Sequence, residues 1–327
     1  MKQIVLFNNK GGVGKTTFLM HLGFALEKSG KKILFIDADP QCNLTSYICS
    51  DAQIEQFWNS NQSIYGAVSP LIKGTGDVTE IQPYHKPNRN IWLLPGDLLL
   101  SQYEETLSRA WIDALAGREV GFRITSSIYR LINNIASAKE IDFILVDVGP
   151  NLGSLNRAVL LGCNYFIVPL VPDLFSLRGL ENIGKTFIQW IDEWQNASQR
   201  FKEKPFIIQQ GKPAFAGYVN QQFNIYRQRE ANAWKTFTAK VPSAIDENIV
   251  QKLKKIDDRL VIDLNGGSYN LGDVRNYHSL APLAQSKLKP IFELDSSDGV
   301  FGTHVQNAKD CLDAFTILAS KIIKKLS

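Results

Sequence analysis

The sequence predicts an α/β protein in which a doubly wound, mostly parallel sheet is flanked by helices. Short apolar runs alternate with longer segments whose apolar residues recur at helical spacing, which is typical of parallel sheets. The first two runs also enclose a glycine-rich turn and a helical segment, which makes a β-α-β unit. The composition agrees: hydrophobic residues make up 44% and charged residues 21% of 327 residues, which excludes a disordered, collagen-like or coiled-coil protein.

The first β-α-β unit comprises a strand over Ile4–Phe7, a helix over Thr16–Ser29 and a strand over Lys32–Ile36. Its two strands should be parallel and joined by a right-handed crossover. After residue 50 the pattern weakens, because apolar residues become isolated among Asn, Gln, Ser, Gly and Pro. We therefore expect an insertion near residues 52–90 that contains a short helix.

The rest of the chain continues the alternation. We expect further strands over Ile91–Leu94, Asp142–Val146, Tyr165–Leu170 and Ala214–Val219, and helices over Asp97–Leu115, Phe122–Ala138, Leu177–Trp194 and Phe223–Phe237. Three glycines predict a loop over Asn265–Asp273, within a second insertion near residues 256–273. A closing helix is expected over Thr303–Leu326. Because no repeat, low-complexity tract or proline-rich linker interrupts the chain, residues 1–327 should form a single domain.

Some classes of protein are excluded by what the sequence lacks. No run approaches the 18 apolar residues that are needed to cross a bilayer. The chain starts with the first strand and shows no signal-peptide pattern, so a cytoplasmic location is expected. Neither a zinc site nor a disulfide framework is predicted, because no C-x-x-C pair occurs among Cys42, Cys49, Cys163 and Cys311.

A phosphate-binding loop is predicted between the first strand and the first helix, where residues 8–17 read N-N-K-G-G-V-G-K-T-T. Backbone N–H groups in such a loop, together with the helix N-terminus, can cradle phosphates. Lys15 would neutralise the β- and γ-phosphates, and the Thr16 hydroxyl would bind Mg²⁺. The predicted cradle comprises Lys10, Gly11, Gly12, Val13, Gly14, Lys15, Thr16 and Thr17.

The segment K-G-G-V-G-K-T-T resembles the loop K-G-G-x-G-K-[ST]-[ST] of the ParA/MinD family of deviant Walker A P-loop ATPases. Asn9 stands where an ordinary P-loop has glycine, and Lys10 occupies the position of the early lysine that marks the family. The resemblance implies that Lys10 reaches the phosphates of the partner subunit in an ATP-sandwich homodimer. It also implies ATP and Mg²⁺ as cofactors and slow ATP hydrolysis, with Lys10, Lys15 and Asp39 as catalytic residues.

Two later segments resemble the first switch and the Walker B strand of that family, and the segment G-P-N-L-G that follows the Walker B strand resembles the second switch. The segment F-I-D-A-D-P-Q matches the first switch, D-x-D-P-Q, which assigns Asp39 to the metal-bound or attacking water and leaves Asp37 to support the loop. Cys42 follows where the family often has glycine. The segment F-I-L-V-D is a Walker B pattern that delivers Asp147 to the Mg²⁺ shell. The predicted metal residues are therefore Thr16, Asp39 and Asp147.

The resemblance also implies that adenine is the base. The segment A-G-Y-V-N is expected to end a late strand at Asn220, where the family places an adenine-contacting asparagine. A GTPase would have N-K-x-D there, whereas this chain continues Q-Q-F. Pro242, in the segment K-V-P, resembles the end of the next strand on the adenine side. Asn220 and Pro242 are therefore expected to contact ATP.

A concentration of positive charge indicates what the ATPase could act on. Between Asn196 and Arg259 twelve basic residues face six acidic ones, which gives +6 within a chain of net charge +4. Such a surface, repeated in a dimer, would contact DNA phosphates without reading sequence, and ParA-type proteins use surfaces of this kind. The basic residues are Arg200, Lys202, Lys204, Lys212, Arg227, Arg229, Lys235, Lys240, Lys252, Lys254, Lys255 and Arg259.

The leading interpretation is a ParA-type ATPase that dimerises with ATP, binds nonspecific DNA and so associates with the nucleoid. A ParB-like or other adaptor would stimulate it to position a plasmid, chromosome region or other cargo. Because the chain begins at the first strand, we expect no N-terminal helix-turn-helix. The alternative is a MinD-like positioning ATPase whose C-terminal amphipathic helix binds anionic lipid, although helical spacing of this kind is more common in helices that pack on the core. The residues that would contact lipid are Phe315, Ile317, Leu318, Ile322, Ile323 and Leu326, with Lys321, Lys324 and Lys325.

Overall fold

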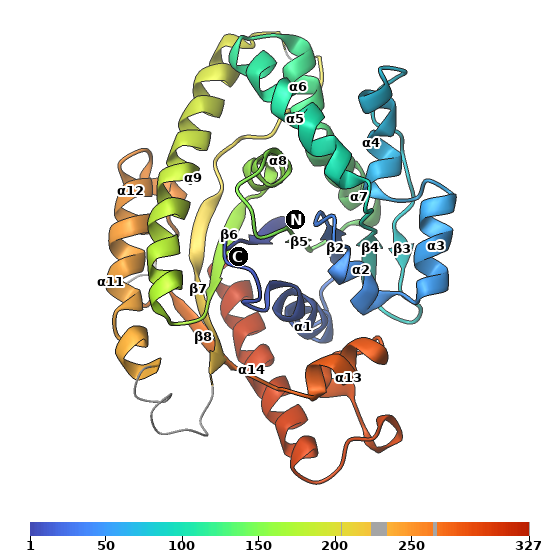
Figure 1. Cartoon of the computed structure of the whole chain (residues 1–327), viewed down its shortest axis with the longest axis vertical. Helices are drawn as coiled ribbons and strands as arrows, with labels where there is room; N and C mark the ends of the chain where they lie inside the picture. The colour runs from blue at the N-terminus through green and yellow to red at the C-terminus, as the bar shows by residue number, and fades with distance from the viewer. Residues whose placement is uncertain (204, 224–233, 264–266, 327) are drawn as a thin grey trace.

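The chain is built around one eight-stranded sheet, shown in Figure 1 as a computed structural model that describes residues 1–203, 205–223, 234–263 and 267–326. The strand order is β3-β4-β2-β5-β1-β6-β7-β8. Within the described residues, every neighbouring pair is parallel except β3 and β4. This confirms the predicted fold class. The strands are β1 (Lys2–Leu6), β2 (Ile33–Asp37), β3 (Tyr84–His85), β4 (Ile91–Leu94), β5 (Phe143–Asp147), β6 (Tyr165–Leu170), β7 (Ala214–Phe223) and β8 (Asn270–Arg275).

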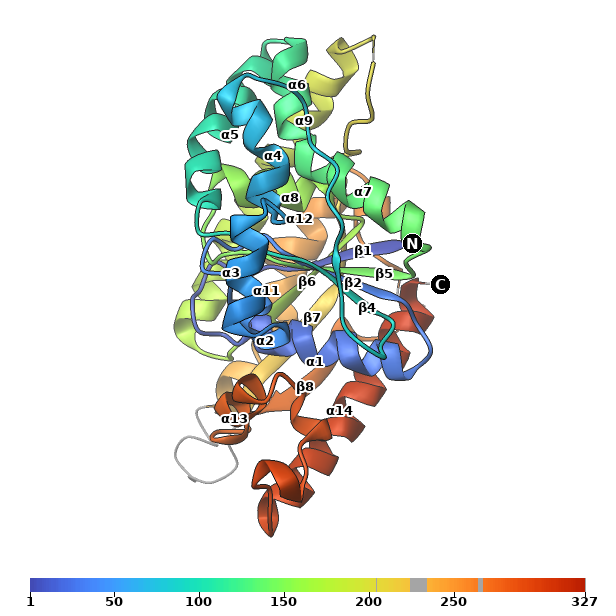
Figure 2. The ribbon, with the colours of Figure 1, turned by 90° about the vertical axis from the view of Figure 1, so that its right-hand side faces the viewer.

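Helices cover both faces of the sheet, which Figure 2 shows nearly edge-on. One apolar layer involves α4 to α9, α11 and α12, and the other involves α1 to α3, α13 and α14. The central strands are buried on both sides and therefore read as continuous apolar runs. The helices are α1 (Lys15–Lys28), α2 (Asn43–Ile48), α3 (Asp51–Asn59), α4 (Ile64–Lys73), α5 (Leu100–Leu115), α6 (Glu119–Thr125), α7 (Ser127–Lys139), α8 (Ser154–Gly162), α9 (Leu174–Arg200), α11 (Val241–Ile245), α12 (Gln251–Lys254), α13 (Leu280–Ser286) and α14 (Thr303–Leu326), with a π-helix η1 (Asp246–Val250) and 3₁₀ turns η2 (Asp258–Leu260), η3 (Ile291–Glu293) and η4 (Ser296–Asp298).

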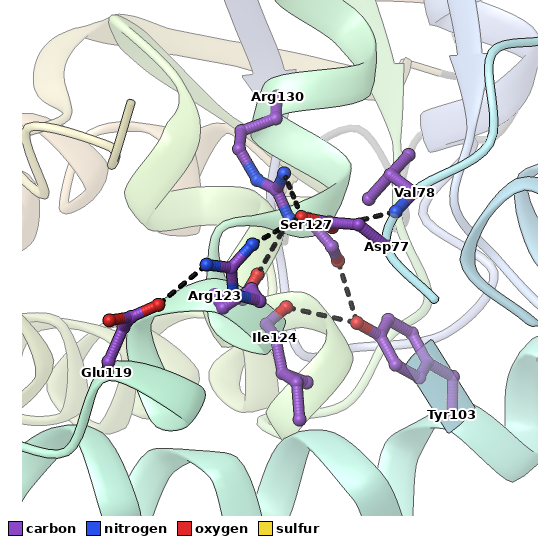
Figure 3. Close-up of polar contacts among 8 residues, drawn as sticks. All are labelled: Asp77, Val78, Tyr103, Glu119, Arg123, Ile124, Ser127 and Arg130. Carbon is purple, nitrogen blue, oxygen red and sulfur yellow. Dashed lines mark hydrogen bonds and ion pairs between the residues drawn. The ribbon is translucent and has the colours of Figure 1, made fainter. Parts of the chain in front are cut away.

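The predicted insertion near residues 52–90 holds more than one short helix, because it contains α3, α4 and the edge strand β3. An ionic cluster fastens it to the helical layer (Figure 3). Asp77 accepts hydrogen bonds from Arg130 at 2.5 and 3.0 Å and from Arg123 at 2.7 Å. Partial burial alone would raise the pKa of Asp77, but the hydrogen bonds from the two arginines outweigh it and lower the pKa to about 2. The insertion is therefore anchored by charge as well as by apolar packing.

In the C-terminal half, one predicted loop is wrong and one predicted helix is wrong at its start. The stretch 265–273 is not simply a loop, because residues 270–273 begin β8, which pairs with β7. Its Asn, Gly and Asp residues are poor strand formers, but burial of Leu271 and Val274 and the pairing with β7 override that preference. The helix predicted over Phe223–Phe237 starts inside β7. Residues 224–233 lie outside the described part of the chain, and residues 234–238 are helical.

The predicted closing helix is confirmed as α14, and its apolar face is already covered. Phe315, Leu318, Ile322 and Leu326 are at most 3% exposed, in the layer that includes α1 and β8, whereas Ile317 is 57% exposed. The four buried side chains are not available to lipid in this arrangement, which weighs against the MinD-like alternative. Within the described residues, no helix combines the length and the apolar character that crossing a bilayer requires.

Candidate nucleotide-binding site

The predicted phosphate loop lies between β1 and α1, at the carboxyl edge of the sheet, where doubly wound proteins bind their ligands. Asn8 fixes its first turn: the side-chain amide donates to the Pro169 carbonyl at 2.7 Å, and the side-chain oxygen accepts from the Lys10 N–H at 2.9 Å. Gly12 and Gly14 have φ angles of 71° and 81°, which glycine adopts without strain. The loop is thus held at the start of α1, where backbone N–H groups can meet phosphate.

A cavity of about 450 Å³ opens beside the loop. The structure brings most of the predicted nucleotide residues to it, and burial lowers the pKa of Lys15 although Asp147 and Asp39 oppose that shift. Several further lining residues lie outside the phosphate loop and were not predicted to contact the nucleotide. Among them is Tyr47, whose hydroxyl lies 3.0 Å from that of Thr17. The lining residues are Gly11, Gly12, Val13, Gly14, Lys15, Thr16, Thr17, Asp39, Gln41, Asn43, Tyr47, Pro150 and Gln285.

The end of β5 offers a place for a metal ion. The Thr16 hydroxyl donates to Asp147 Oδ2 at 2.6 Å, while Oδ1 of the same carboxylate is buried without a hydrogen-bond partner in the described structure. Burial raises the pKa of Asp147 to about 8, and the charge on Asp37 adds to the shift. A divalent cation held by Thr16 and Asp147 would supply the missing positive charge, so these residues fit Mg²⁺. When bound, Mg²⁺ would stabilise charge on the phosphates.

The two aspartates of the first switch lie in different surroundings. Asp37 is fully buried and accepts from the Thr45 N–H at 2.7 Å and the Thr45 hydroxyl at 2.6 Å, and burial raises its pKa to about 7. Asp39 instead lines the cavity and accepts from the Gln41 N–H at 3.0 Å. Cys42 has φ 55° and ψ 31°. Cys42 therefore adopts a left-handed backbone conformation, which is strained for a residue with a side chain.

Lys10 is not among the described residues that line the cavity. Its ammonium group forms an ion pair with Asp173, the N-cap residue of α9. Asp173 was not predicted as a site residue. Its place before an amphipathic helix is a capping signal in the sequence, but that signal does not indicate an ionic partner in the phosphate loop.

The residues expected on the base side do not join the loop. β7 continues to Phe223, so Asn220 does not end a strand; it is fully buried and donates to Asp273 at 2.7 Å. Pro242 lies in the first turn of α11, which packs against α9. The strand end predicted at Pro242 is therefore wrong, and neither Asn220 nor Pro242 lines the described cavities beside the loop.

Gln221, the neighbour of Asn220, does reach the loop. Its side-chain oxygen lies 2.6 Å from the position that a Cβ atom would have on Gly14. It borders a second cavity of about 150 Å³, which shares Gly14 and Thr17 with the first and has apolar walls that include Phe18 and Phe315. The amide nitrogen of Gln221 is buried and has no hydrogen-bond partner among the described residues. Of the two neighbouring amides, Gln221 therefore faces the loop, whereas Asn220 binds Asp273.

The predicted basic residues divide into paired and unpaired ones. Lys212 and Arg259 form ion pairs with Asp257. A set that we call the basic segment lies on residues 234–255, where no ion pair of its side chains is found in the described structure; it comprises Lys235, Lys240, Lys252, Lys254 and Lys255. Arg200 is exposed at the end of α9, and Lys202 is exposed just after it. Lys204, Arg227 and Arg229 lie outside the described residues.

The sequence comparisons identify the family. A family model described as an AAA domain matches residues 1–200, more than half of the chain. The chromosome-partitioning ATPase Soj of Treponema pallidum is 30% identical over 180 residues, which cover 55% of this chain and 60% of Soj. The chain belongs to the ParA/MinD family of P-loop ATPases. It spans 48% to 73% of the length of other curated relatives compared.

Solved structures show that the ParA/MinD fold extends over the whole chain. Protein DIP2308 from Corynebacterium diphtheriae is 24% identical with a TM-score of 0.71, and the match covers 100% of this chain and 99% of that one. A putative plasmid partition protein from Borrelia burgdorferi B31, bound to AMPPNP, is 19% identical with a TM-score of 0.60, and 99% of each chain is covered. At these identities the likeness shows the fold alone.

Proposed function

We propose that this ParA/MinD-family protein is an ATP-dependent, dimerising ATPase that binds nonspecific DNA and positions a plasmid, chromosome region or other cargo. Slow hydrolysis would be stimulated by a ParB-like or other adaptor. The observation that carries the proposal is the separation of two lysines on one loop, since Lys15 lines the cavity whereas Lys10 is turned to α9. Lys10 does not line the cavity of its own chain, so it could serve a second subunit once it leaves Asp173.

The proposed chemistry is phosphoryl transfer to water. This reaction needs positioning, a metal ion and charge neutralisation and no covalent nucleophile. Lys15 would neutralise the phosphates, Thr16 and Asp147 would hold Mg²⁺, and Asp39 would orient the attacking water. Lys10 from the partner subunit would complete the charge around the phosphates, so hydrolysis would depend on the dimer.

For the base we propose the second cavity. Its apolar walls suit a planar ring, and the unpartnered amide of Gln221 can donate to a ring nitrogen. Gln221 replaces Asn220 and Pro242 in this role because the side chain of Asn220 is engaged by Asp273 and Pro242 lies in α11.

The proposed DNA contact rests on the basic segment. Lys235, Lys240, Lys254 and Lys255 are exposed. A dimer would present this charge twice, and phosphate contacts of this kind weaken steeply with salt. The name of Soj as a chromosome-partitioning ATPase agrees with this proposal.

Binding to nonspecific double-stranded DNA tests the proposal. We would measure it with ATP, ADP or no nucleotide across a salt series, for the unchanged chain, for Lys10→Ala and for the matched control Lys73→Ala, an exposed lysine of α4. ATP-dependent, salt-sensitive binding that only Lys10→Ala loses is expected. A double variant, Lys254→Ala with Lys255→Ala, should also lower the salt slope by about 2. Absence of DNA binding despite measured ATP binding would refute the DNA role and direct the search to liposomes and protein partners.

A further inference from the structure

The ion pair between Lys10 and Asp173 engages the lysine that the proposed dimer needs elsewhere. Asp173 divides its two oxygens: Oδ1 accepts from the Ser176 N–H at 2.7 Å as the cap of α9, and Oδ2 binds the Lys10 ammonium. The two side chains are 32% and 33% exposed, so solvent screens their attraction only in part. The helix fixes the carboxylate in place, which makes it a preformed acceptor for the lysine.

The loop on the other side of this ion pair is also seated on α9. The side-chain oxygen of Asn9 lies 3.0 Å from where a Cβ of Gly179 would be, so any larger residue at Gly179 would crowd Asn9. Partial burial alone would raise the pKa of Asp173, but hydrogen bonds from Lys10 and Ser176 leave it below its ordinary value. The carboxylate is therefore ionised at neutral pH and competes for cations.

We propose that Asp173 is a positioning residue for dimerisation: it holds Lys10 within its own chain and competes with the phosphates of a partner subunit for that lysine. This inference rests on the proposed function. Without nucleotide the ion pair forms within the chain and each subunit keeps its lysine. A nucleoside triphosphate bound to a second copy carries more negative charge than one carboxylate and so draws Lys10 across.

The partner that this surface fits is a second copy of the chain. Leu174 and Phe175, which directly follow Asp173, are 53% and 76% exposed. A large exposed aromatic beside a charged group is the kind of residue that anchors protein interfaces. The copy that receives Lys10 would lie against the start of α9 and cover Phe175. Dimerisation would thus both release Lys10 from Asp173 and bury Leu174 and Phe175.

The test uses Asp173→Asn, which removes the charge and keeps the helix cap, because Asn and Asp cap equally well. Asp192→Asn, a change of the same chemistry at an exposed position of α9, is the matched control. We would measure the dimer dissociation constant by sedimentation equilibrium with Mg²⁺ and AMPPNP. A partly exposed ion pair contributes about twofold to fivefold. Since a dimer releases two lysines, Asp173→Asn should dimerise about 4-fold to 25-fold more tightly, and the control should not change.

A second measurement detects the ion pair without a dimer. A double-mutant cycle with Lys10→Ala and Asp173→Asn on urea unfolding of the nucleotide-free chain should show coupling of about twofold to fivefold in the unfolding equilibrium constant. Absence of coupling, or unchanged or weaker dimerisation of Asp173→Asn while the unchanged chain dimerises, would overturn this inference alone. Coupling without any dimer at saturating AMPPNP would overturn the proposed function, and the competition with it.

Discussion

His21 gives the stability of the protein a pH dependence that can be worked out from its contacts. The ring is buried in α1, with Nδ1 at 2.6 Å from the Thr17 carbonyl oxygen and Nε2 accepting the Ile291 N–H at 2.9 Å. These partners assign the neutral tautomer with the hydrogen on Nδ1. A second proton on Nε2 would face the Ile291 N–H. Burial lowers the pKa of His21 to about 4, although its hydrogen bond to Thr17 acts in the opposite direction.

The magnitude follows from linkage. An unfolded histidine titrates near pH 6.5, so between pH 6.5 and about 4 the unfolded chain binds a proton that the folded chain does not. Stability therefore falls with falling pH in this window, by about 3 kcal/mol, because burial lowers the pKa of His21 from 6.5 to about 4. Most of this loss in the free energy of unfolding should have occurred by pH 4.5.

The assay is urea unfolding of the unchanged chain and of His21→Gln at pH 7, 6, 5 and 4.5. Glutamine is uncharged throughout, so the difference in the free energy of unfolding between the two proteins isolates the histidine from carboxylates that titrate nearby. At pH 7 the variant should be less stable by about 1–2 kcal/mol because it satisfies the two backbone partners less well. That deficit should vanish or reverse by pH 4.5. A deficit that stays constant over this range would refute the reasoning.

Three further changes have defined outcomes. Asp147→Asn removes a buried carboxylate whose raised pKa makes the folded state lose stability as the pH rises from about 4 to 8. In urea unfolding at pH 7 the nucleotide-free variant should be more stable by about 2 kcal/mol, and a loss of stability would contradict this. In calorimetry the variant should bind Mg²⁺-ATP at least tenfold more weakly. Asp77→Ala leaves Arg123 and Arg130 without their shared acceptor and should cost about 2 kcal/mol; a thermal-unfolding midpoint equal to that of the unchanged chain would count against the anchor. At Cys42, glycine should be more stable than alanine by about 1 kcal/mol, because only alanine keeps the left-handed strain, and the opposite order in urea unfolding would exclude that strain.

The parts of the site that the sequence predicts are those that a short stretch of chain can build. The phosphate loop joins a strand to the helix that follows it, so its residues are adjacent by construction. Asp39 and Asp147 could be placed beside it because both follow buried apolar strands, and the carboxyl ends of parallel strands meet at one edge. Their roles at the nucleotide came from the resemblance of D-x-D-P-Q and F-I-L-V-D to motifs of the family, and strand direction adds that both lie at the same edge as the loop.

The remainder depends on contacts between distant segments. Asp173 lies 163 residues from Lys10, and their ion pair exists only because the start of α9 packs beside the loop. Asn220 was predicted because the family places an asparagine at the end of this strand, whereas β7 continues to Phe223. Successive side chains of a strand face opposite sides, so Asn220 and its neighbour Gln221 have different surroundings. β8 was missed because its pairing with β7 overrides a composition that is typical of a loop.

The two edge strands of the sheet determine how readily copies of the chain could aggregate through their sheets. The edge strand β3 is two residues long, and Pro83 and Lys86 flank it, while the opposite edge strand β8 carries Asp273 and Arg275. Short strands, proline and charge are features that prevent one sheet from adding to another. Copies of the chain at high local concentration should therefore resist irreversible edge-to-edge aggregation, which is compatible with the reversible dimer proposed above.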